Sequence, residues 1–153
     1  MGAVRTPLAR LLALAYRSMI DDLHTRLAAR AWENIRPAYG FVLLAVRDEP
    51  LTPTALATQL DVTKQAASKL ADAMVTDGLL TRVVDKTDSR RKLLALTPRG
   101  VELLAAVESI YAELEAEWAE SIGPAEVDAM RTNLADVLHH RFGEILPAIR
   151  PTP

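Results

Sequence analysis

The sequence predicts a mainly α-helical protein with one small β-hairpin. Three observations support this fold class. Apolar residues recur every three or four positions over most of the 153 residues, which is the spacing of amphipathic helices. Two β-prone runs, residues 79–84 and 93–96, are separated by a short polar loop. The dipeptide Thr-Pro stands at 52–53 and 97–98, where threonine can cap a helix and proline can occupy its first turn.

The first half of the chain contains four predicted helices. The first covers residues 6 to about 33 and carries a long apolar stripe. The second begins at Pro37, where the missing N–H costs nothing, and ends before residue 48. The third follows residues 52–53. After a tight connection at 61–62, we expect Thr63 to cap a fourth helix that continues to about residue 76.

The second half begins with the hairpin and continues as two helices. A polar loop over residues 85–92 joins the two strands. A fifth helix runs from 98 to about 121, and Gly123-Pro124 breaks the chain before a sixth, which continues until Pro147. Helix, helix, short helix, tight turn, helix and hairpin, in this order, form a winged helix-turn-helix.

The fourth predicted helix is suited to lying in a DNA groove. Its spacing places one apolar set on the core side: Val62, Ala66, Leu70, Ala73 and Met74. The other side would then present polar and small residues: Lys64, Gln65, Ser68, Ala67 and Ala71. Gln and Lys can reach base edges, Ser and Lys can reach phosphate, and small residues would let the backbone approach closely. An ordinary solvated helix face is the alternative interpretation.

The hairpin loop carries four cations and two acids: Asp85, Lys86, Asp88, Arg90, Arg91 and Lys92. A cationic tip beside a recognition helix can enter the narrow minor groove, where the negative potential is strongest. Asp88 lies two residues before Arg90, close enough to hold its guanidinium in one orientation. A charged, solvated turn is the alternative, but it would not explain why this loop follows a helix-turn-helix.

The segment from Asp85 to Gly100 resembles the wing signature of the MarR (multiple antibiotic resistance regulator) family. It reads D-x-x-D-x-R-R-K-x-L-x-L-T-P-x-G, with several fixed positions. Residues 62–70, VTKQAASKL, are similar to the recognition helix of that family. The matched block spans roughly Thr52 to Gly100, and the flanking helices agree in length and order.

The resemblance implies a homodimer that binds palindromic double-stranded DNA operators, usually as a repressor. Many members of the family lose affinity for DNA when a small, often aromatic or phenolic, effector binds. The single domain would cover residues 1–153, with the winged helix-turn-helix at about 36–100 and dimerisation helices at about 5–34 and 98–147. By motif position, Arg90 would enter the minor groove with Asp88 as its partner. The full set of expected DNA-binding residues is Thr63, Lys64, Gln65, Ser68, Lys69, Asp88, Arg90, Arg91 and Lys92.

Two further surfaces follow from the apolar residues. Four aromatic residues could line an effector pocket, with packing in the core as the alternative: Tyr16, Trp32, Tyr39 and Trp118. The first and last helices offer more apolar surface than one winged lobe can cover, which predicts an obligate homodimer. That surface comprises Leu8, Leu11, Leu12, Leu23, Leu134, Leu138, Phe142, Ile145 and Leu146.

The net charge of −2 argues against nucleic acid on its own, but its distribution is uneven. Residues 61–92 carry seven Lys or Arg against five Asp. Residues 101–130 carry eight acids and no base. The two segments are therefore expected to face different surroundings, although a solvated helix face would also account for the acidic run.

Other function classes lack support in the sequence. The absence of cysteine excludes disulfides and thiolate metal sites, and the neighbouring His139 and His140 point about 100° apart on a helix, so no metal or cofactor is expected. We find no phosphate loop, nucleophile elbow or zinc-protease motif, so an enzyme is not expected. No apolar run is long enough for a membrane span or a signal peptide, which predicts a cytoplasmic protein. The competing interpretation is a winged-helix protein-interaction module, which would not need a cationic wing.

Overall fold

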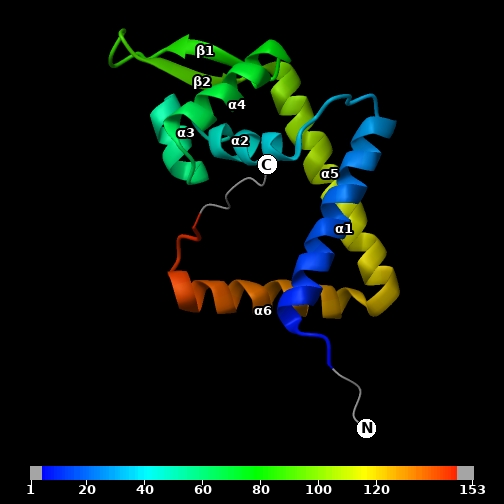
Figure 1. Ribbon diagram of the computed structural model, residues 1–153. Helices are drawn as coiled ribbons and strands as arrows, with labels where there is room; N and C mark the ends of the chain where they lie inside the picture. Colours follow the sequence, from blue (N-terminus) through cyan, green and yellow to red (C-terminus); the bar gives the residue numbers. More distant parts are fainter. Residues whose placement is uncertain (1–4, 148–153) are drawn as a thin grey trace.

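A computed structural model describes residues 5–147, which form six α-helices and one two-stranded antiparallel sheet (Figure 1). The first four and last six positions of the predicted 1–153 domain lie outside the described residues. The elements are α1 (Leu8–Ala29), α2 (Pro37–Val46), α3 (Pro53–Leu60), α4 (Lys64–Thr76), β1 (Leu80–Val84), β2 (Lys92–Leu96), α5 (Pro98–Ile122) and α6 (Pro124–Phe142). The predicted fold class, mainly α with a small hairpin, is confirmed.

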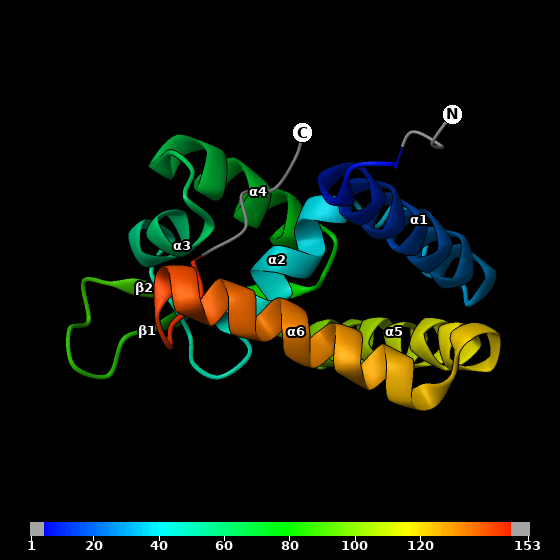
Figure 2. The same cartoon turned by 90° about the horizontal axis from the view of Figure 1, so that it is seen from below.

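Helix α5 connects two ends of the molecule. At one end lie α2, α3, α4 and the hairpin, and the loop between β1 and β2 projects away from the helices (Figure 1). Helix α5 runs from the hairpin to the opposite end, where α1 packs along it and α6 crosses below (Figures 1 and 2). The predicted wing therefore lies at the opposite end of the molecule from α6 and the start of α1, two of the segments expected to form the dimer (Figure 1).

The core lies mainly at the hairpin end of α5. It is built from side chains of α2, α3, α4 and both strands, together with the last turns of α1 and the first half of α5. Its largest fully buried members are Leu27, Tyr39, Val42, Leu43, Leu56, Met74, Leu79, Leu80, Leu94, Leu103 and Ile110. Within residues 5–147, no buried polar side-chain atom lacks a hydrogen-bond partner.

Three threonines cap helices as predicted. The side-chain oxygens of Thr52, Thr63 and Thr97 accept hydrogen bonds from the backbone N–H three residues later, at 3.1, 3.1 and 3.0 Å. Each bond satisfies one of the free N–H groups at a helix start, and such a cap is worth about 1 kcal/mol. Helix α1 is shorter than predicted. It ends at residue 29, and the chain turns through Ala31 and Asn34, which both have positive φ.

The start of α5 is fitted tightly against the start of the hairpin. The Thr97 hydroxyl donates a hydrogen bond to the carbonyl of Gly78 at 2.6 Å, and the Thr97 N–H donates to the carbonyl of Leu79 at 3.1 Å. Gly100 is buried, and a methyl group at its Cα would overlap the Leu79 carbonyl oxygen. Only glycine lets the two backbones approach this closely.

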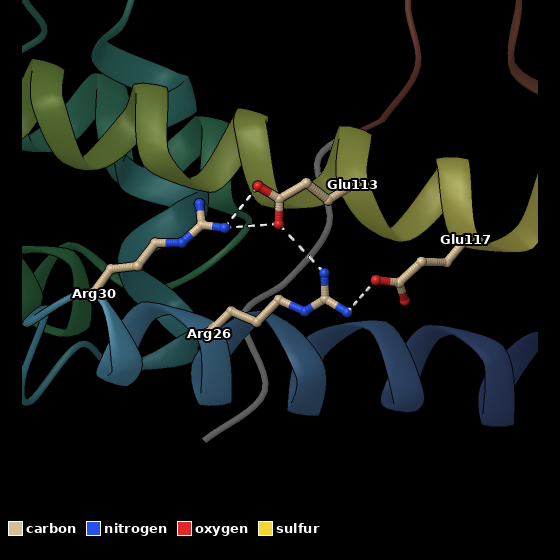
Figure 3. Close-up of polar contacts among 4 residues, drawn as sticks. All are labelled: Arg26, Arg30, Glu113 and Glu117. Carbon is tan, nitrogen blue, oxygen red and sulfur yellow. Dashed lines mark hydrogen bonds and ion pairs between the residues drawn. The ribbon is translucent and has the colours of Figure 1, made fainter.

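Ion pairs join α1 to α5 in the middle of the molecule (Figure 3). The Arg30 guanidinium donates to both carboxylate oxygens of Glu113, at 2.6 and 2.7 Å, and Arg26 bridges Glu113 and Glu117, at 3.3 and 2.6 Å. The hydrogen bond from Arg30 is the main cause that lowers the pKa of Glu113. Arg47, directly after α2, pairs with Glu108 of α5, and Arg131 of α6 pairs with Glu115 of α5. Much of the acidic run thus faces arginines of neighbouring helices instead of bulk water alone.

The apolar surface predicted for dimerisation is largely exposed. Of the described residues, none in α6 is buried, and Val137, Leu138 and Phe142 remain 66, 40 and 46% exposed. Leu8, Leu11 and Leu12 of α1 are also exposed. The inclusion of Leu23 in this surface was wrong, because its side chain turns into the core and is only 5% exposed. Over residues 5–147, no helix combines the length and the apolar character needed to cross a membrane.

Candidate nucleic-acid interface

Helix α4 is rotated relative to the sequence prediction. Its buried residues are Ala67, Ala71 and Met74, whereas Ala66 is exposed. The prediction that Ala67 and Ala71 face outward was therefore wrong. The physical reason is that two small side chains, 0 and 1% exposed, let α4 pack closely on the core of the lobe. The small residues serve packing between helices and not an approach to DNA.

The polar residues expected to read DNA lie on accessible parts of α4. Lys64, Gln65 and Lys69 are exposed, and Ser68 is half-buried at the edge of the buried face. At 100° per residue, Gln65 and Lys69 point almost opposite to the buried stripe, while Lys64 points toward one side. Thr63 is exposed and caps the helix, so its hydroxyl already holds the N–H of Ala66.

A third side chain shares the outward face with Gln65 and Lys69. Asp72 lies one turn beyond Lys69 and is exposed, and its carboxylate forms an ion pair with the guanidinium of Arg82 in β1. Neither residue was predicted at the interface from the sequence. The positions i, i+4 and i+7 could have placed Asp72 on this face, but only with the correct rotation of α4.

The loop between the strands is shaped by aspartates that bind the backbone. Asp85 accepts hydrogen bonds from the N–H and hydroxyl of Thr87, at 2.9 and 2.8 Å, and these bonds are the main cause that lowers its pKa. Asp88 accepts a bond from the N–H of Arg90 at 3.0 Å, and its carbonyl accepts one from the N–H of Arg91. The loop is thus a sequence of tight turns closed by short side chains.

The expected ion pair between Asp88 and the Arg90 guanidinium is not formed. The Asp88 carboxylate instead binds the backbone N–H of Arg90, because a side chain two residues earlier reaches the main chain more easily than the far end of a long side chain. Among the described residues, the guanidinium of Arg90 has no ion-pair partner. Arg91 lies 3.8 Å from Asp85, and Lys92 is exposed at the start of β2. The wing therefore presents a free guanidinium on a backbone fixed by Asp88.

An apolar pocket of about 250 Å³ lies between α1, α2 and α5. Its walls are mainly aliphatic, and its few polar groups come from Tyr16, His24, Arg36 and Tyr111. Burial lowers the pKa of His24, against the opposing effects of the Ile35 backbone and Asp21, and burial raises the pKa of Tyr111. Both groups are therefore neutral at neutral pH. The pocket suits a small, largely apolar molecule.

Of the four aromatic residues predicted to line a pocket, only Tyr16 lines this one. Tyr39 is fully buried, and its hydroxyl donates to Asp77 at 2.7 Å; burial, followed by this contact, raises the pKa of Tyr39 to about 12. Trp32 packs under the Arg99 guanidinium, 4.7 Å from its ring centre. Trp118 lines a second apolar pocket, of about 350 Å³, between α1, α5 and α6, and Tyr16 also borders this pocket.

The part of the chain described by the structure holds no cluster of three or more side chains suited to a metal ion. His24 lies in the pocket between α1 and α2, whereas His139 is in the last turn of α6, where its ring nitrogen lies 2.9 Å from the Gly143 carbonyl oxygen.

Comparison with known proteins relates this chain to one family of regulators. A sequence model of the MarR family matches residues 34–91, which span α2, α3, α4, β1 and most of the loop of the hairpin. Reduced MarR from E. coli has the same fold over 89% of this chain and 99% of its own, with a TM-score of 0.74 and 25% identity. In sequence over residues 34–91, and in fold over most of its length, the chain is similar to the MarR family.

The names of two further relatives describe DNA binding and transcriptional regulation. A variant of MepR from S. aureus bound to an oligodeoxyribonucleotide is 26% identical and has a TM-score of 0.59, over 90% of this chain and 99% of its own. A protein of Thauera aromatica, described as a candidate transcriptional regulatory protein for the hcr operon, is 30% identical over 95 residues. That match covers 61% of this chain and little more than half, 57%, of the relative.

The relatives of this chain are named as transcriptional regulators and not as enzymes. They include BldR from Sulfolobus solfataricus, which is 25% identical with a TM-score of 0.62 over 87% of this chain and 93% of its own. The hairpin and α4 are thus the wing and recognition helix of a winged helix-turn-helix, as the sequence predicted.

Proposed function

We propose that this chain is a transcriptional regulator of the MarR family that binds specific double-stranded DNA as a homodimer. One observation carries the proposal: the exposed face of α4 with Gln65 and Lys69 lies in the same lobe as a projecting loop whose Arg90 guanidinium is unpaired. A helix of this kind fits the major groove, and a cationic ribbon beside it fits the adjacent minor groove. The relative MepR, whose variant is bound to an oligodeoxyribonucleotide, supports a role in DNA binding.

Each predicted residue has a distinct proposed role. Gln65 contacts adenine and Lys64 contacts guanine through their major-groove edges, and Lys69 contacts phosphate. Arg90 enters the minor groove, with Asp88 fixing its backbone. The phosphate backbone is contacted at the edges of this surface by Ser68, Arg91, Lys92 and the capped end of α4 at Thr63.

Dimerisation uses the end of the molecule opposite the wing. The exposed apolar residues of α1 and α6 would be covered by a second copy of the chain. Soluble monomers seldom expose apolar patches of this size. We place the winged helix-turn-helix at residues 36–100 and the dimerisation segments at about 5–34 and 98–147. A two-fold axis would set two copies of α4 about one helical turn, ~34–36 Å, apart, so the operator is an inverted repeat.

A small aromatic effector is proposed to bind the pocket between α1, α2 and α5 and to weaken DNA binding, which makes the chain a ligand-responsive repressor. The volume of about 250 Å³ and the neutral His24 and Tyr111 favour an uncharged or phenolic molecule. Thermal unfolding in a panel of phenols tests this, since a ligand of the folded state raises the midpoint with its concentration. Ile20→Trp, which fills the pocket, should abolish the rise.

Selection of bound fragments from the source genome, followed by footprinting, tests the main proposal. We expect a two-fold symmetric footprint and a steep fall of affinity with salt. Lys69→Ala should weaken binding to all sequences and reduce the salt slope by ~1 per subunit, whereas Gln65→Ala should relax one symmetric pair of positions. The competing protein-interaction module predicts no salt-sensitive binding to any duplex, and that result would exclude DNA binding.

A further inference from the structure

The face of α4 that is proposed to meet DNA carries a carboxylate. Gln65, Lys69 and Asp72 follow one another at spacings of four and three, opposite the buried Ala67, Ala71 and Met74. The side chain of Asp72 is 64% exposed. A bare carboxylate here would repel the phosphates on both sides of the major groove, because like charges held close together without a partner raise the free energy of binding.

Arg82 neutralises this carboxylate from the other half of the interface. In the hairpin register Arg82 lies opposite Leu94, and two residues from Leu80, whose cross-strand partner is Leu96. Since side chains alternate along a strand, Arg82 shares the face of the hairpin that Leu80 and Leu94 turn toward the core. From that face its guanidinium reaches Asp72 and pairs with it.

The pair also joins the two parts that would contact DNA. Helix α4 would occupy the major groove and the wing the minor groove, so their relative position sets whether both can bind at once. Arg82 lies in β1, two residues before the end of the strand that leads to the loop. The pair is thus a direct side-chain link between recognition helix and wing.

We propose that Arg82 is a positioning residue for DNA binding, whose main effect is to hold the Asp72 charge away from the phosphates. The proposal rests on the DNA-binding function proposed above. It makes the effect of Arg82 depend on Asp72: without the carboxylate, most of the need for the arginine disappears. Two other roles for Arg82 make different predictions. A direct phosphate contact would act whatever stands at 72, and a solvated surface pair would not influence binding at all.

A double-mutant cycle in the full chain separates these roles. Affinity is measured for the parent, Arg82→Ala, Asp72→Asn and the double variant, on a selected genomic fragment and on a mixed-sequence duplex of about 30 base pairs. We expect Arg82→Ala to weaken binding about tenfold, Asp72→Asn to change it less than about threefold, and the double variant to return to within about threefold of the parent. Arg82→Lys, which keeps the charge, should recover part of the loss.

The salt dependence gives an independent readout. A direct phosphate contact by Arg82 would lower the salt slope by ~1 per subunit in both Arg82→Ala and the double variant, whereas a positioning role leaves the slope of the double variant at the parent value. Arg17→Ala, which breaks an exposed pair with Asp21 in α1, controls for loss of one positive charge. Thermal unfolding identifies any variant that fails to fold. If an Arg82 variant fails, the affinities of Asp72→Asn and the parent, compared at several salt concentrations, still test the role of the pair.

Additive losses in the cycle, or an Arg82→Ala protein that binds as tightly as the parent, would overturn the positioning role. These outcomes differ from failure of the proposed function, in which the parent itself would show no salt-sensitive binding to either duplex.

Discussion

At the scale of single residues, the position of Arg90 depends on a loop backbone that the Asp88 side chain holds in place. The carboxylate of Asp88 fixes the N–H of Arg90 and leaves its guanidinium free. We expect Arg90→Ala to weaken operator binding by ~1–3 kcal/mol, because it removes a charged contact to DNA without touching the core. Asp88→Ala should cost less, since it loosens the turn but keeps the guanidinium. Binding assays beside light scattering check both, and unchanged affinity of Arg90→Ala would mean that the wing tip does not contact DNA.

Tyr39 gives a prediction about pH. Its pKa of about 12 in the folded protein lies above the ordinary value of 10, so the neutral phenol is favoured by folding. The stabilisation from Tyr39 is therefore fully present below pH 10 and is lost as the pH rises toward 12. Ultraviolet titration of tyrosinate should show a late component near pH 12 that is smaller in Tyr39→Phe, where only the raised pKa of Tyr111 remains. Ionisation of all tyrosines near pH 10 would contradict the buried contact with Asp77.

Residue types alone could not settle the faces of α4. The stripe that includes Ala66 and the stripe that includes Ala67 are almost equally apolar, because alanine contributes little hydrophobic signal. Thr52, Thr63 and Thr97 were predictable as caps, since the capping bond is local and depends on residue identity. The prediction of the caps was correct and that of the buried face of α4 was wrong, because the rotation of a helix is decided by packing against distant residues.

At the scale of elements, the contact of α5 with the hairpin depends on one glycine. Gly100→Ala should destabilise the fold by about 3 kcal/mol or more, because the new methyl group meets the Leu79 carbonyl, which belongs to the backbone and cannot turn aside. Gly40→Ala in α2 is the matched control. Nothing lies within 4 Å of its Cβ position, so we expect a gain of ~0.5–1 kcal/mol from reduced freedom of the unfolded chain. Chemical denaturation measures both, and equal effects would argue against the close approach.

The arginine contacts between α1 and α5 predict sensitivity to acid. The pKa of Glu113 is lowered mainly by its hydrogen bond from Arg30, so its contribution to stability is present above the ordinary value of 4.5 and is lost as pH falls through the lowered pKa. Glu113→Gln should therefore make unfolding less dependent on pH in this acidic range. Glu120→Gln removes a charge from the same helix and serves as the control. An unchanged acid profile in Glu113→Gln would show that the ion pairs do not persist in solution.

Elements were more predictable from sequence than contacts between them. Helix order, the hairpin and the breaks at Pro37 and Gly123-Pro124 follow from local patterns. The pair between Asp72 and Arg82, and the position of Tyr39 in the core and Tyr16 at the pocket, depend on how elements pack. Nothing in one sequence distinguishes an aromatic residue in the core from one that lines a cavity.

At the scale of the whole molecule, the exposed side chains of α1 and α6 predict a dimer. Light scattering at micromolar concentration should give twice the 16.8 kDa of one chain. Val137→Glu, at a position 66% exposed in α6, should shift the mass toward one chain, because it places a charge in the proposed interface. Val84→Glu is the control, at a valine 53% exposed in β1 and outside the proposed dimerisation segments. A parent mass of one chain would refute the homodimer.

The close contact at Gly100 also makes α5 a lever. Its 25 residues extend about 37 Å at 1.5 Å per residue. At Gly100 its backbone packs so closely on the hairpin that the two should move together. A tilt of only about 5° at the far end would therefore carry the wing lobe through roughly 3 Å, about the rise of one base pair. Small adjustments among α1, α5 and α6 would thus change the span between two recognition helices by amounts that an operator of fixed spacing can detect.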